Sequence, residues 1–104
     1  MIDQINTFID YASTLDGDEK GEAQVFCDRL FQAFGHEGYK EAGATLEFRV
    51  KSKKKTNFAD LLWGERVLIE MKKKGAQLPS HRTQIFDYWW KLRPNQPKYS
   101  ILCN

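Results

Sequence analysis

Residues 45–72 read TLEFRVKSKKKTNFADLLWGERVLIEMK and contain the clearest strand patterns of the chain. The first part of this stretch, Thr45–Lys51, alternates apolar and polar side chains, which is the period of a strand with one buried and one solvent-facing side. Two further apolar runs follow, Phe58–Leu62 and Val67–Lys72, joined through Trp63-Gly64-Glu65-Arg66. The stretch therefore predicts three strands in an antiparallel meander.

Two helical patterns precede the meander. Residues 3–14 and Glu19–Phe34 repeat their apolar side chains near the 3.6-residue period of an amphipathic helix. The segment Asp16-Gly17-Asp18 separates them, and we expect Asp18 to cap the second helix and Gly35 to end it.

One helix and one strand follow the meander. Ser80 is predicted to cap a helix that runs to about Leu92 and stops before Pro94. Tyr99–Cys103 is a short apolar run that predicts a last strand. Because a helical crossover leads to it, this strand should lie parallel to an earlier one. The expected fold class is α/β: a mixed four-stranded sheet flanked by helices, with an extra N-terminal helix in residues 1–17 and the core in residues 18–104.

Length and composition restrict the classes of protein that are possible. A chain of 104 residues forms one core, and its 41% hydrophobic content contains no apolar run long enough to cross a membrane. The polar start Ile2–Asn6 has no resemblance to a secretion signal, so we expect a cytoplasmic protein. Cys27 and Cys103 have no zinc-site spacing and predict no disulfide framework.

Two acids and a lysine on the meander form the candidate site. Residues two apart on a strand share a face, so Glu70 and Lys72 point to the same side. If the turn has the three residues Gly64 to Arg66, Asp60 lies directly opposite Glu70, whereas a two-residue turn would send Asp60 to the other face. Two close carboxylates repel unless a cation or a proton relieves them.

Two carboxylates on directly opposite residues offer only oxygen ligands, which favour Mg²⁺, with Mn²⁺ as a substitute, over zinc. Lys72 would then lie where it stabilises negative charge developing on a phosphate. The alternative is that all three residues are ordinary surface residues of a hairpin, because the D-x9-E-x-K spacing is short and common.

The pattern of elements around Asp60, Glu70 and Lys72 resembles the PD-(D/E)XK nuclease superfamily, whose restriction-endonuclease-like core is αβββαβ. Here Ala59-Asp60 stands in place of the family's Pro-Asp. The resemblance implies metal ligation by Asp60 and Glu70 and a catalytic role for Lys72. It also implies that Glu22 completes the metal shell or holds a water, although by itself Glu22 is an ordinary carboxylate near a helix start.

Gln84-Ile85-Phe86-Asp87-Tyr88 matches the Q-x-x-x-Y motif of the RecB-like branch of that superfamily. Gln84 and Tyr88 share a helix face, and the resemblance implies that they support the site or contact the DNA backbone. Both would otherwise be ordinary helix-surface residues. Lys53, Lys54 and Lys55 at the hairpin tip, with Lys73 and Lys74 after the last acid, are candidate phosphate contacts, although lysine runs are usually only solubilising.

The segment from Gly17 to Gly35, with Asn57-Phe58-Ala59-Asp60 and Leu68-Ile69-Glu70-Met71-Lys72, looks more specifically like the N-terminal endonuclease domain of single-chain type II restriction-modification enzymes. That resemblance implies a prokaryotic fragment of a longer chain with an adenine methyltransferase and a target-recognition region. The glycine-rich cofactor motif and the Asn-Pro-Pro-Tyr signature of the methyltransferase are absent from these 104 residues.

The sequence therefore predicts a Mg²⁺-dependent endonuclease acting on double-stranded DNA, with dimerisation where both strands are cut. Two rivals stay open. One is a RecB-like exonuclease or repair nuclease, and the other is a DNA-binding or assembly module with the same shape and no chemistry.

Overall fold

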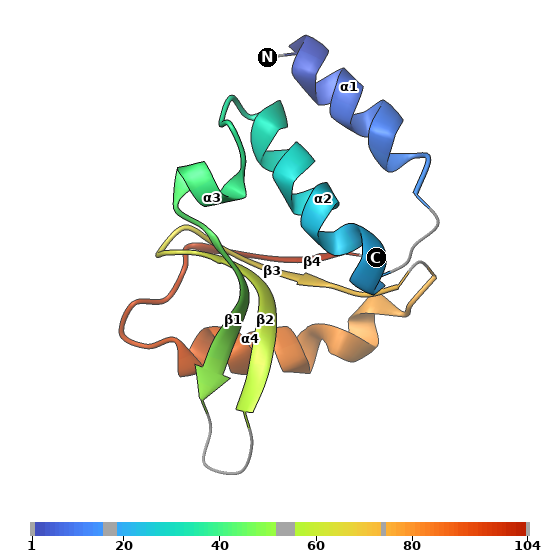
Figure 1. Ribbon diagram of the computed structural model, residues 1–104. Coiled ribbons are helices and arrows are strands. Elements are labelled where there is room, and N and C mark those ends of the chain that lie inside the picture. The colour runs from blue at the N-terminus through green and yellow to red at the C-terminus, as the bar shows by residue number, and fades with distance from the viewer. Residues whose placement is uncertain (1, 16–18, 52–55, 74, 104) are drawn as a thin grey trace.

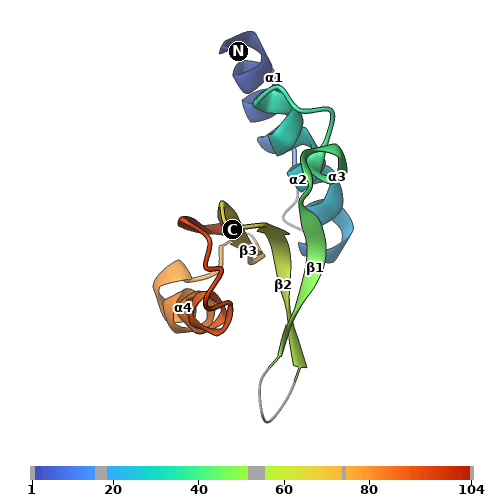
Figure 2. The same ribbon diagram turned by 90° about the vertical axis from the view of Figure 1, so that its left-hand side faces the viewer.

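A mixed four-stranded sheet lies between two layers of helices in the computed structural model, which describes residues 2–15, 19–51, 56–73 and 75–103 (Figure 1). Helix α2 covers one face of the sheet and helix α4 the other, while α1 packs on α2 away from the strands (Figure 2). In chain order the elements are α1 (Ile2–Ala12), α2 (Glu19–Ala33), α3 (Tyr39–Ala42), β1 (Thr45–Lys51), β2 (Thr56–Trp63), β3 (Val67–Met71), the 3₁₀ turn η1 (Leu78–His81), α4 (Arg82–Lys91) and β4 (Tyr99–Cys103). The predicted α/β class, with its N-terminal helix, is confirmed.

The strands lie in the order β1-β2-β3-β4. The first two pairs are antiparallel, and β3 pairs with β4 in parallel, as a helical crossover requires. Trp63 pairs with Val67, so the β2–β3 turn has the three residues that the sequence analysis required. Gly64 adopts a left-handed φ of 49° in this turn, and the Arg66 N–H donates to the Trp63 carbonyl at 2.9 Å.

Each face of the sheet has its own apolar core. The residues buried between the sheet and α2 are Cys27, Phe31, Ala44, Leu61 and Ile69. Those buried between the sheet and α4 are Val50, Ala59, Leu68, Ile85 and Tyr88. Leu61 and Leu68 are fully buried on opposite faces, so the β2–β3 hairpin is fixed from both sides.

The sequence predicted that buried and solvent-facing side chains alternate strictly along Thr45–Lys51, and this prediction is wrong at Glu47. Leu46 packs with the α2-side core, yet Phe48, two residues on, packs with the α4-side core. Glu47 between them has a φ of 50°, an unfavourable value for a residue with a side chain. Opposite it, β2 makes the same change of face between Leu61 and Ala59. In both β1 and β2, the side chains therefore switch from one core to the other, at Glu47 in β1 and at Asp60 in β2.

Two other details differ from the sequence prediction. The hydroxyl of Ser80 donates to the Gln77 carbonyl at 2.7 Å and caps no helix, because a 3₁₀ turn precedes α4. The short helix α3 was not predicted, since four residues carry no period. The expected cap Asp18 lies outside the described residues. Within the described part of the chain, no helix has the length and apolar character that a bilayer crossing requires.

Candidate functional site

Asp60 and Glu70 meet where the β2–β3 ladder opens. Leu61 and Ile69 form the last pair of that ladder, and the next position on each strand is an acid. The N–H of Asp60 donates to Oε1 of Glu70 at 3.1 Å, and the N–H of Met71 donates to Oδ2 of Asp60 at 2.6 Å. Each carboxylate thus accepts a hydrogen bond from a backbone N–H of the neighbouring strand.

Lys72 joins this pair from the end of β3. Its Nζ lies 3.5 Å from Oε2 of Glu70, and its side chain is 16% exposed. The backbone N–H of Lys72 donates to the Cys103 carbonyl at 2.7 Å, which fixes this residue to β4. The structure therefore brings Asp60, Glu70 and Lys72 together, so that one ammonium group lies near two carboxyl groups.

Burial dominates the electrostatics of the site. Glu70 is 4% exposed, and burial together with the negative charge of Asp60 raises its pKa to about 7, although the Asp60 N–H and Lys72 oppose this shift. Burial also raises the pKa of Asp60, against the opposing hydrogen bond from the Met71 N–H. Lys72 alone does not offset one buried and one half-buried carboxylate. A small, hard cation would do so, and carboxylate oxygens are the donors that such a cation prefers.

Gln84 and Tyr88 bond to each other on α4. Nε2 of Gln84 donates to the Tyr88 hydroxyl at 3.1 Å, as expected for residues four apart on one helix face. Burial and, secondarily, the charge of Glu70 raise the pKa of Tyr88. Tyr88 is only 4% exposed, and the DNA contact predicted for it stays a prediction.

The other predicted site residues are not all gathered at Asp60. Glu22 is half-buried in the first turns of α2, directly before Ala23, which lines the cavity beside Asp60. Across the described ranges, no group of three or more His, Cys, Asp or Glu side chains is arranged to hold a metal ion. Lys73 is exposed just after the site. The predicted DNA contacts Lys53, Lys54, Lys55 and Lys74 lie outside the described residues.

A cavity of about 700 Å³ opens beside Asp60, toward α2 and α3. Its lining residues are Ala23, Gln24, Cys27, Tyr39, Leu46, Glu47 and Asp60. The sequence analysis did not assign Gln24, Tyr39 or Glu47 to the site. The β1–β2 register would have found Glu47, because Leu46 pairs with Leu61 and Phe48 with Ala59, which puts Glu47 opposite Asp60.

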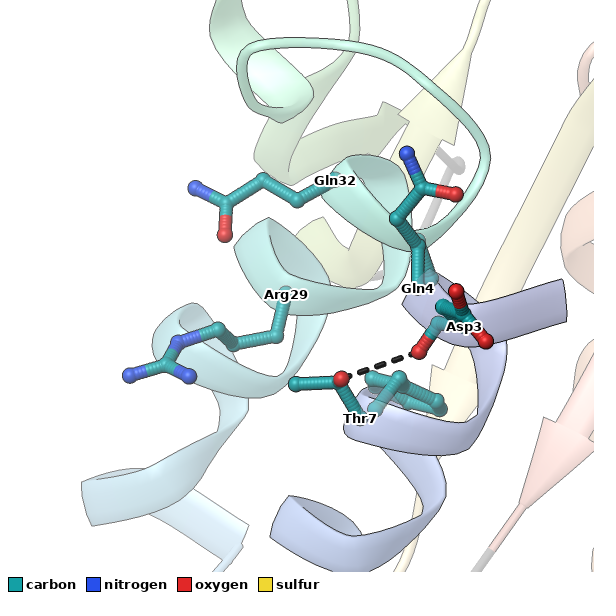
Figure 3. Close-up of a pocket in the computed structure, with 7 residues that line it drawn as sticks. Asp3, Gln4, Thr7, Arg29 and Gln32 are labelled. Atoms are coloured by element: carbon teal, nitrogen blue, oxygen red, sulfur yellow. Dashed lines mark hydrogen bonds between the residues drawn. The ribbon is translucent and has the colours of Figure 1, made fainter. Parts of the chain in front are cut away.

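A second cavity, of about 290 Å³, lies between α1 and α2 (Figure 3). The Thr7 hydroxyl on its wall donates to the Asp3 carbonyl of the same helix at 2.9 Å and so is directed at its own backbone. Its polar side chains include Gln4, Arg29 and Gln32, which extend in different directions in Figure 3. This cavity contains neither Asp60 nor Glu70.

A family model of the MmeI N-terminal domain matches residues 2–104, which is nearly the whole chain. The chain belongs to this family. MmeI is a type II restriction-modification enzyme, so the protein is an N-terminal domain of the restriction-modification class. Searches of the curated proteins and of the solved structures found no match. The MmeI N-terminal domain match includes every residue of the Asp60, Glu70 and Lys72 cluster.

Proposed function

We propose that this domain is the DNA-cleaving part of a restriction-modification enzyme, a PD-(D/E)XK endonuclease that hydrolyses phosphodiester bonds with a divalent metal ion. One observation carries the proposal. Asp60, Glu70 and Lys72, from two strands, meet at the one row where the β2–β3 ladder opens. Surface residues of an ordinary hairpin would not be as buried as Glu70, which is 4% exposed.

Mg²⁺, with Mn²⁺ as a substitute, fits the carboxylates of Asp60 and Glu70. When bound, it supplies charge neutralisation to the phosphate and activates water toward attack. Such sites commonly use one or two carboxylates and complete the shell with water and substrate phosphate, so two acids suffice here. We include Glu22 in the proposal as a residue that holds a water of this shell from α2.

The protein residues do the positioning. Backbone N–H groups of Asp60 and Met71 hold the two carboxylates in place. Lys72 lies 3.5 Å from Glu70 and presents a positive charge for the negative charge that develops on the phosphate. Gln84 and Tyr88 bond to each other at 3.1 Å on α4, and we assign them the supporting role of the RecB-like motif.

The family match supports the proposed partners. We propose that the substrate is double-stranded DNA, that a methyltransferase and a target-recognition region belong to the same longer chain, and that two copies of the domain cooperate where both strands are cut. Lys53, Lys54, Lys55, Lys73 and Lys74 are the cations proposed to contact the DNA backbone.

The test uses the intact enzyme that contains this domain, with a supercoiled plasmid as substrate and either MgCl₂ or EDTA. The wild type should cut the circle only with Mg²⁺, and Asp60→Asn should cut about 10³-fold more slowly, which corresponds to roughly 4 kcal/mol. Asp10→Asn on the exposed face of α1 is the matched control and should cut normally.

Two results would contradict the proposal. Cutting of linear but not circular DNA would assign the domain to the exonuclease class. Plasmid binding without cleavage, unaffected by Mg²⁺ and by Asp60→Asn, would identify a DNA-binding module.

A further inference from the structure

The cavity beside Asp60 has two chemically different walls. Glu47 and Asp60 on β1 and β2 line one side with acids. The helical side presents neutral groups, namely Ala23, Gln24, Cys27 and Tyr39, and burial raises the pKa of the Cys27 thiol to about 12, which keeps it uncharged. Its volume of about 700 Å³ is within the range of pockets that take small ligands or parts of larger ones.

The two polar side chains of the helical wall contact each other. Nε2 of Gln24 donates to the hydroxyl of Tyr39 at 3.4 Å. The hydroxyl accepts in this bond, so its own hydrogen is not used there. Neutral amide and phenol donors are among the groups that position a DNA backbone through its phosphate oxygens.

Tyr39 is held firmly for a residue in so short a helix. Its N–H donates to Oδ1 of Asp28 at 3.2 Å, and its ring packs against the α2-side core. Gly38 fits only because it has no side chain, since a Cβ there would overlap the Asp28 carboxylate. At the other end of α3, the carbonyl of Ala42 accepts from Nε1 of Trp63 at 2.9 Å. Helix α3 is therefore fixed to both α2 and β2.

We propose that Tyr39 and Gln24 bind the backbone of the DNA strand being cut, on the side of Asp60 that faces α2 and α3. This inference rests on the proposed function. A phosphodiester in the cavity would be repelled by Glu47 and received by the donors on the opposite wall. Because α3 is fixed before the substrate arrives, the pair orients the strand without a further ordering cost.

The experiment measures single-turnover cleavage of a supercoiled plasmid by the intact enzyme. Tyr39→Phe removes only the hydroxyl and should lower the rate about 10-fold, and the double variant with Gln24→Ala about 100-fold, since a hydrogen bond to a charged group contributes roughly 1.5–3 kcal/mol. Plasmid affinity, measured by filter binding in EDTA, should change less than about threefold, because the recognition region holds the DNA. The melting temperature should stay the same.

Tyr99→Phe and Gln4→Ala are the matched controls, because Tyr99 is 67% exposed on β4 and Gln4 is exposed on α1. Both should cut at the wild-type rate. A double variant that cuts normally would overturn the inference, as would a slower rate accompanied by a lower melting temperature, which would show that the pair acts through the fold. Asp60→Asn is measured in parallel. If it stops cleavage while the double variant does not, only this inference fails; if it cuts normally, the proposed function fails and the inference with it.

Discussion

Two neighbouring rows of the β2–β3 hairpin have opposite physical characters. In one row Leu61 and Ile69 pair through the ladder and are 0% and 2% exposed. In the next row the carboxylates of Asp60 and Glu70 accept hydrogen bonds from backbone N–H groups of Met71 and Asp60, and Glu70 is nearly as buried as Ile69. One residue step along each strand thus separates apolar packing from buried like charge.

This contrast indicates that the two rows of the hairpin have different roles. Burying an aliphatic side chain stabilises a fold by roughly 1.5–3 kcal/mol, whereas burying a carboxylate costs free energy unless a positive partner compensates. The apolar row therefore holds the register, and the acidic row depends on it. We expect changes in the first row to affect folding, and changes in the second to affect chemistry.

Ile69→Ala should have the largest effect. Loss of this buried side chain leaves a cavity against Cys27 and Phe31 and should lower the free energy of unfolding by about 2–5 kcal/mol. Urea denaturation measures the change. Ile9→Ala is the matched control, because Ile9 is 54% exposed on α1, and it should change stability by less than about 0.5 kcal/mol. Equal effects at the two positions would mean that the hairpin core does not hold the fold.

Lys72→Ala should separate chemistry from folding. Without its ammonium, plasmid cleavage by the intact enzyme should fall about 10²–10³-fold, which corresponds to roughly 3–4 kcal/mol of lost transition-state stabilisation. The fold should persist, because the backbone N–H of residue 72 still donates to the Cys103 carbonyl. Circular dichroism checks the fold, and Lys98→Ala, at an exposed lysine before β4, is the control. Normal cleavage by Lys72→Ala would remove this residue from the mechanism.

The acidic row could be predicted because its position depends on local rules. The apolar runs and the three-residue turn fix Trp63 opposite Val67, and the alternation of side chains then brings Asp60 to Glu70. The final parallel strand followed from the helical crossover. These features depend on short separations in the chain.

The far wall of the cavity could not be predicted in the same way. Tyr39 reaches it through a four-residue helix fixed by Asp28 and Trp63, which are distant contacts that leave no period in the sequence. Glu47 was assigned to a regular wet face because alternation assumes ordinary backbone angles, and its φ of 50° breaks that assumption. Both failures come from tertiary contacts and backbone strain, which override local pattern.

Glu70→Gln should give the smallest effect, a change in the free energy of unfolding. The sign of that change tests whether the charge of the acidic row, Asp60 and Glu70, is already compensated. The pKa of Glu70 is about 7 in the folded protein, against 4.5 for an ordinary exposed glutamate. Because the folded protein binds this proton more tightly than the unfolded chain does, protonation of Glu70 stabilises the fold. This stabilisation is fully present below pH 4.5 and is lost as the pH rises through 7. At pH 8 in EDTA, Glu70→Gln should therefore be more stable than the wild type by roughly 1–3 kcal/mol, and at about pH 4.5 this difference should nearly vanish. Glu37→Gln, at an exposed position, is the matched control. Adding Mg²⁺ at pH 8 should then stabilise the wild type and not Glu70→Gln, because only the native carboxylate pair gains a ligand. If Glu70→Gln is instead the less stable protein at pH 8, Lys72 and the Asp60 N–H already compensate the charge, and the acidic row needs no cation to be stable.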